Sequence, residues 1–125
     1  MVEEKKTRWC KICGVTSPKD GRILSEIGVS AIGLMFYQDS DRYVSYERAK
    51  RVSDEIKSVN PSVRTVGVFV NPTSDMVGDA IAEVGVDMLQ FHGSESPSFC
   101  ANFGLPYIKS VGVTAKTNFV QLDAE

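Results

Sequence analysis

The thiol of Cys13 is the side chain near the start of the chain that is best suited to chemistry. It ends a stretch of large apolar and β-branched residues over 8–13, and Gly14 and Ser17-Pro18 follow it, which predicts a short strand, a turn and a helix. In α/β proteins the loops after parallel strands meet at one edge of the sheet, and active sites lie there. A thiolate at this position can serve as a base or a nucleophile, and the alternative is a buried structural thiol.

Cys10 and Cys13 also form a C-x-x-C pair, for which His92 and Cys100 are the other soft ligands in the sequence. Residues three apart on a strand point to opposite faces, and this geometry disfavours a metal site. A redox pair needs a helix N-terminus beneath both thiols, which the predicted strand does not supply. Three cysteines, an odd number, argue against a disulfide framework.

Two further candidates follow later predicted strands. Arg42 lies in the polar loop over 37–44, and an arginine there can grip a carboxylate through two parallel hydrogen bonds. His92 ends a predicted strand, at the edge of the sheet where Cys13 and Arg42 are expected. The alternatives are a solvated loop for Arg42 and a satisfied structural histidine for His92.

The elements that must position these residues alternate between strand and helix along the whole chain. Expected strands cover 8–13, 30–36, 63–70, 86–91 and 105–113, and expected helices cover 17–27, 45–59, 72–84, 94–103 and 114–125. Five βα units repeating about every 23 residues predict a parallel sheet with right-handed crossovers. Either a doubly wound flavodoxin-like sheet or five-eighths of a (β/α)8 barrel has this pattern, and periodicity does not separate them.

Bulk composition narrows the class of protein. The chain has 125 residues, 42% of them hydrophobic and 24% charged, which fits one globular domain over 1–125. A net charge of −2 supplies no basic field, so no nucleic-acid partner is expected. No apolar run approaches the ~20 residues that span a bilayer, and no signal-peptide core is present, so we expect no membrane partner and a cytoplasmic location.

The residues at the strand ends speak against the flavodoxin-like functions. Cys13-Gly14 and Asn71 stand where a receiver domain needs its carboxylates. No Ser/Thr-rich phosphate loop follows the first strand, and the sequence contains no G-x-G-x-x-G.

Several motifs together resemble one family. They are Lys11-Ile12-Cys13-Gly14, Ala31-Ile32-Gly33-Leu34-Met35-Phe36, Ser40-Asp41-Arg42, Val66-Gly67-Val68-Phe69-Val70-Asn71, Gln90-Phe91-His92-Gly93 and Ile108-Lys109. In this order they resemble phosphoribosylanthranilate isomerase, the (β/α)8-barrel enzyme of tryptophan biosynthesis. The chain departs from the family pattern at Asp41, where the family has proline, and at Phe91, where it has leucine.

The resemblance implies an Amadori rearrangement of N-(5-phosphoribosyl)anthranilate, an aldose–ketose isomerisation. It assigns Cys13 as the general base and Arg42 as the residue that binds near the anthranilate carboxylate. His92 is implied as a second substrate-binding residue at the same rim. No metal or organic cofactor is implied, because the substrate nitrogen itself serves as the electron sink.

The family's barrel has eight βα units, whereas the sequence predicts five here. The resemblance therefore implies an incomplete barrel, inactive alone, which associates with itself or with a chain that supplies the remaining strands. The inward apolar faces of the strands over 31–36 and 63–70 are then expected to lie open. The alternative is a non-catalytic flavodoxin-like module or assembly partner derived from the same family.

Overall fold

The computed structural model describes residues 9–110, which form one parallel sheet with helices between its strands. The strands are β1 (Lys11–Cys13), β2 (Ala31–Met35), β3 (Arg64–Phe69), β4 (Met88–Phe91) and β5 (Tyr107–Lys109). The helices are α1 (Pro18–Ile27), α2 (Tyr46–Val59), α3 (Ser74–Val84), the short α4 (Pro97–Cys100) and the 3-10 turn η1 (Ala101–Phe103). The helix expected over 114–125 lies outside the described residues.

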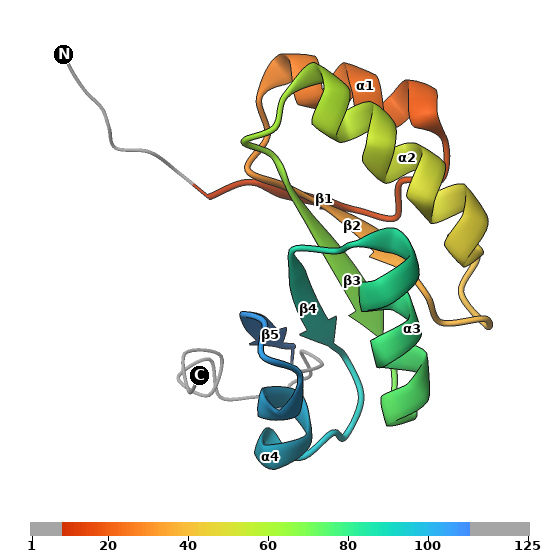
Figure 1. Ribbon diagram of the computed structural model, residues 1–125, viewed down its shortest axis with the longest axis vertical. Coiled ribbons are helices and arrows are strands. Elements are labelled where there is room, and N and C mark those ends of the chain that lie inside the picture. Colours follow the sequence, from red (N-terminus) through yellow and green to blue (C-terminus); the bar gives the residue numbers. More distant parts are fainter. Residues whose placement is uncertain (1–8, 111–125) are drawn as a thin grey trace, which may run out of the picture.

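The strand order decides between the two architectures. The strands lie in the order β1-β2-β3-β4-β5, and every neighbouring pair is parallel. A flavodoxin-like sheet has the order 2-1-3-4-5, because one crossover reverses direction and puts helices on both faces. Here each right-handed crossover moves one strand onward, so the helices cover one face (Figure 1). The fold is therefore a partial barrel of the (β/α)8 type, and the flavodoxin-like alternative is wrong.

Local sequence signals set the helix ends. The hydroxyl of Ser17 accepts a hydrogen bond from the Asp20 N–H, and Pro18 opens α1 as predicted. Gly28 ends α1 with a φ of 91°, a conformation that glycine adopts without strain. The helix expected over 94–103 is shorter than predicted, because after Cys100 the chain tightens into η1.

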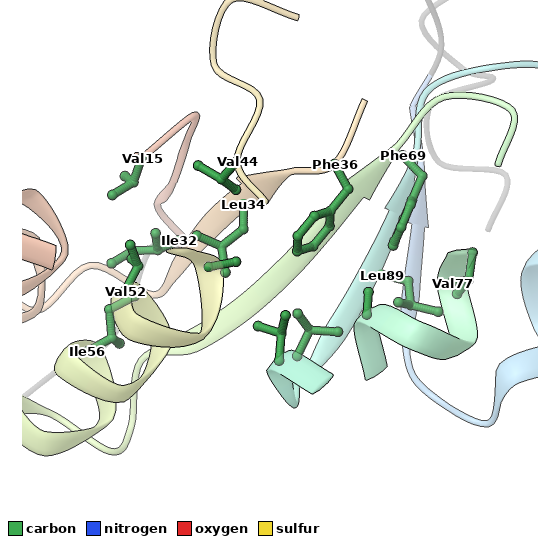
Figure 2. Packing of buried hydrophobic residues seen from close by; sticks show 14 of the residues in the cluster. Val15, Ile32, Leu34, Phe36, Val44, Val52, Ile56, Phe69, Val77 and Leu89 are labelled. Carbon is green, nitrogen blue, oxygen red and sulfur yellow. The ribbon is translucent and has the colours of Figure 1, made fainter. Parts of the chain in front are cut away.

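The main core lies between the sheet and its helices. Ile32 and Leu34 of β2 pack there against Val52 and Ile56 of α2 (Figure 2). Successive outward residues of the strands continue this layer, with the Phe69 ring stacked on Phe91 at a centroid distance of 5.9 Å. Burial of alternate strand residues against helices explains why these strands read as nearly continuous apolar runs.

The other face of the sheet holds a second cluster of short side chains. Ala31, Val66 and Val68 are 0% exposed there and contact Cys13, Met35 and Met88. The expectation that this inward face lies open is therefore wrong for these residues, because a sheet curved toward a barrel brings its inward side chains into mutual contact. The large exposed apolar side chains include Ile12, Ile23 and Ile27, on β1 and α1.

Between residues 9 and 110, no helix has both the length and the apolar character that crossing a bilayer requires.

Asp87, just before β4, forms hydrogen bonds with residues of α2 and β3. Its Oδ2 accepts hydrogen bonds from Lys57 Nζ on α2 at 2.6 Å and from the Thr65 N–H on β3 at 2.9 Å. Burial raises the pKa of Asp87, but the hydrogen bonds from Lys57 and Thr65 outweigh burial and hold that pKa below its usual value of 3.8. The ionised carboxylate therefore stabilises the fold above that value.

We expect Asp87→Asn to lower the free energy of unfolding at pH 7 by about 1–2 kcal/mol, because hydrogen bonds to a charged group are lost. The wild-type advantage should disappear as the pH falls below 3.8 and through the folded-state pKa, since the native carboxylate then becomes protonated. Urea unfolding at pH 7 and pH 3 measures both effects. Asp54→Asn, which breaks an exposed pair with Lys50, is the matched control and should change little. Equal effects of the two variants would contradict this account.

Candidate functional site

The three predicted site residues lie at the edge of the sheet where the parallel strands end. Cys13 is the last residue of β1, Arg42 follows β2, and His92 directly follows β4. The loops of a parallel sheet converge at this edge, so side chains far apart in sequence can meet one ligand.

Cys13 points to the inward face of the sheet and is half-buried. It pairs with Gly33 on β2, where a Cβ atom would lie only 2.9 Å from the Cys13 Sγ, so glycine makes room for the thiol. Lys11 lies two residues earlier on the same face, and its Nζ donates a hydrogen bond to the Cys13 Sγ. Lys11 was not predicted as a site residue, although the two-residue period of a strand places it beside Cys13.

The other cysteines lie elsewhere. Cys10 is exposed, and Cys100 is buried in the core on the helix side of the sheet, opposite to the face on which Cys13 lies. Within residues 9–110, no three side chains of His, Cys, Asp or Glu come together in a way that could hold a metal ion.

Arg42 lies across the turn that follows Cys13. A Cβ atom on Gly14 would stand 2.7 Å from the Arg42 Nη1, and Gly14 has a φ of 82°, so both space and backbone conformation favour glycine. Cys13, Gly14 and Arg42 line the same cavity, together with Asp20 and Ile23 of α1. The structure thus brings the thiol and the guanidinium to one cavity.

His92 lies in a row of polar side chains on the inward side. Gln90 Nε2 is 2.9 Å from His92 Nε2 and 2.8 Å from Ser110 Oγ. With the amide N–H donating, the neutral imidazole accepts at Nε2 and carries its proton on Nδ1. The sequence analysis did not predict Gln90 as a site residue. It lies two residues before His92, and residues two apart on a strand share a face, so this spacing could have identified it.

The charges around His92 favour its neutral form. Burial and then the Lys11 ammonium lower the pKa of His92 below its usual value of 6.5, and Lys109 lowers it further. The Glu95 carboxylate acts in the opposite direction but does not outweigh them. Lys11 thus acts on both candidates, because it contacts Cys13 and repels a proton on His92.

This arrangement can bind an anionic ligand and remove a proton from it. The Arg42 guanidinium supplies a planar fork for a carboxylate, and the Cys13 thiol is the group in the same cavity that can take a proton. The neutral His92 can donate or accept a hydrogen bond at neutral pH.

Comparisons with known proteins point to one family. The family model described as N-(5'-phosphoribosyl)anthranilate (PRA) isomerase matches residues 10–125. The N-(5'-phosphoribosyl)anthranilate isomerase of Nitrosomonas eutropha is 45% identical over 111 residues, which are 89% of this chain and 52% of the relative. The chain spans about half the length of the curated relatives it matches.

Solved structures agree with these matches. The crystal structure of phosphoribosyl anthranilate isomerase from Thermotoga maritima has a TM-score of 0.75 and 36% identity, covering 86% of this chain and 52% of that one. Another phosphoribosyl anthranilate isomerase, in complex with reduced 1-(o-carboxyphenylamino)-1-deoxyribulose 5-phosphate, has a TM-score of 0.76 and 37% identity. It covers 86% of this chain and 55% of that one.

Proposed function

Since the chain belongs to the N-(5'-phosphoribosyl)anthranilate isomerase family, we propose that it carries the proton-abstracting half of that isomerase site. The reaction would convert N-(5'-phosphoribosyl)anthranilate to 1-(2-carboxyphenylamino)-1-deoxyribulose 5-phosphate in tryptophan biosynthesis. The observation that supports this most directly is that Cys13 and Arg42, at the ends of neighbouring strands, line one cavity, which also borders α1.

Cys13 is proposed as the general base. Once the ribose ring has opened to a Schiff base, the thiolate takes the proton from C2, and the electron pair moves through the C1–C2 bond onto the protonated nitrogen. The product of this step is an enolamine with a hydroxyl on C2. It becomes the ketone when C1 gains a proton and the C2 hydroxyl loses its own. The substrate nitrogen accepts the electrons, so the step requires no cofactor.

Arg42 is proposed to bind the anthranilate carboxylate, with His92 contacting the substrate from the same rim. In an assembly that turns over, Arg42→Lys should raise the Michaelis constant about tenfold, because an ammonium cannot reproduce the two parallel hydrogen bonds of a guanidinium. Steady-state kinetics test this, with Arg51→Lys on the exposed side of α2 as the control. An unchanged Michaelis constant would mean that Arg42 belongs to a solvated loop.

The proposal includes an assembly that extends the sheet. Among the described residues, β1 pairs only with β2 and β5 pairs only with β4, so both outer strands have an unpaired edge. Ile12 of β1 and Ile23 and Ile27 of the following helix α1 are exposed, with exposed fractions of 37%, 42% and 70%. We propose that further βα units, from a second copy or from a chain with complementary strands, cover these side chains.

The proposed function is tested by binding and by turnover. Reduced 1-(o-carboxyphenylamino)-1-deoxyribulose 5-phosphate, the ligand of the related structure, is titrated calorimetrically into the chain mixed with the C-terminal half of the Nitrosomonas eutropha relative. We expect saturable binding and isomerase turnover in the mixture. A folded mixture without either would contradict the proposal and favour the non-catalytic module. We also propose the cytoplasmic location that the sequence predicts. Fractionation of expressing cells tests it, and the chain should appear in the cytoplasmic fraction.

A further inference from the structure

A buried carboxylate joins the ends of three strands beside His92. The side chain of Glu95, in the loop after β4, is only 2% exposed. Its Oε1 accepts a hydrogen bond from Lys109 Nζ on β5 at 2.9 Å, and its Oε2 accepts one from the Asn71 N–H after β3 at 2.7 Å. Both oxygens of this buried charge are therefore satisfied by groups from neighbouring strands.

Asn71 and Lys109 also hold the backbone between His92 and Glu95. Asn71 Oδ1 accepts hydrogen bonds from the Ser94 N–H at 2.8 Å and from Ser94 Oγ at 3.2 Å, and Lys109 Nζ donates to the Gly93 carbonyl oxygen. Asn71 has a φ of 46°, unusual for a residue other than glycine, which turns its side chain into this loop. A Cβ atom on Gly93 would lie 2.4 Å from Asn71 Oδ1, so the loop packs directly on that amide.

We propose that Asn71, Glu95 and Lys109 are positioning residues that hold the His92 ring at the rim of the site. These three residues, the rim clasp, immobilise Gly93 and Ser94 directly after the histidine. The His92 N–H donates to the Phe69 carbonyl at 2.8 Å, so β3 fixes the other end of the same short segment. This inference rests on the proposed function only in that the proposed function makes His92 a substrate-binding residue.

The rim clasp also contributes to the charge around the imidazole. The charged groups that act on His92 are Lys11 from β1, Glu95 from the loop after β4, and Lys109 from β5. Gln90 and Ser110 are the neutral polar groups in the same row. A change at Glu95 is therefore expected to alter both the position and the pKa of the His92 ring. A change at a residue that only stabilises the fold far from His92 should alter neither.

The test uses the full chain without an affinity tag, because His92 is its only histidine and its ring signals in an NMR spectrum are unambiguous. In Glu95→Gln, the pKa of His92 should fall below the wild-type value, because the one charge that raises it is removed. The ring nitrogen shifts at pH 7.5 should move toward a mixture of tautomers. Glu55→Gln, which removes the partly exposed partner of Arg22 on α2, is the control and should leave the His92 ring signals unchanged.

Asn71→Gly separates the loop contact from the charge. Glycine keeps the backbone N–H that binds Glu95 and tolerates the positive φ, but it removes the acceptor of the Ser94 N–H. We expect amide hydrogen exchange at Ser94 to become about tenfold faster and the His92 ring shifts to change. If Glu95→Gln does not fold, Asn71→Gly decides the question alone.

Unchanged His92 shifts and an unchanged His92 titration in both folded variants would overturn the inference. Lys109→Arg keeps the positive charge and should preserve the wild-type ring signals, whereas Lys109→Met should shift them. None of these readouts depends on turnover. If the folded mixture with the C-terminal half of the relative fails to bind the reduced product analogue while His92 of the chain responds as described, the proposed function is contradicted and the rim clasp is supported.

Discussion

Replacing Cys13 by serine in an assembly that turns over is expected to reduce the turnover number about 10²–10⁴-fold, the usual contribution of a general base. A serine hydroxyl fits the space beside Gly33 but does not ionise near neutral pH, so the proton at C2 loses its acceptor. The Michaelis constant should change little, because Arg42 and not the thiol is proposed to hold the substrate. Steady-state kinetics of the two proteins measure both parameters.

Cys10→Ser is the matched control for this experiment. Cys10 is exposed, and it lies three residues before Cys13, so the same chemical change there should leave turnover unaltered. A fully active Cys13→Ser variant would remove the thiol from the mechanism. Comparable losses in both variants would instead favour a joint role of the C-x-x-C pair.

The chain by itself is expected to show no isomerase turnover and to self-associate in solution. The outer edges of β1 and β5 carry backbone donors and acceptors without strand partners among the described residues. On β1 and on α1, the side chains of Ile12, Ile23 and Ile27 expose apolar surface of the kind that protein interfaces cover. Size-exclusion chromatography with light scattering at micromolar concentration should therefore give a mass above that of one 13.7 kDa chain.

A charge at this edge should weaken the association. Ile23→Glu places a carboxylate in the exposed apolar surface of α1 and should shift the equilibrium toward the single chain. Met76→Glu on α3 changes a residue of similar exposure, 36%, away from β1 and is the control. A well-folded wild-type monomer would contradict the proposed assembly, and turnover by that monomer would contradict the proposal that further βα units complete the site.

Local patterns in the sequence determined the elements and their ends. Ser17, Pro18 and Gly28 bound the first helix as predicted, because capping and left-handed conformations depend on residues close in the chain. The apolar runs that became β2 and β3 likewise identified strands buried on both faces. Placing Cys13, Arg42 and His92 at one edge followed from the parallel arrangement alone, since all such strands end on the same side.

The tertiary structure alone decided the strand order and the partners of the site residues. The βα repeat has the same period in a flavodoxin-like sheet and in a barrel. The pairing of β3 with β2, where a flavodoxin-like sheet pairs β3 with β1, distinguishes them. Glu95 lies in a polar stretch typical of a solvated loop, yet its side chain is buried. Asn71, after β3, and Lys109, on β5, bind it from 24 and 14 residues away in the chain. Such contacts depend on sheet register and curvature, which arise from the packing of the whole chain and leave no local pattern in its sequence.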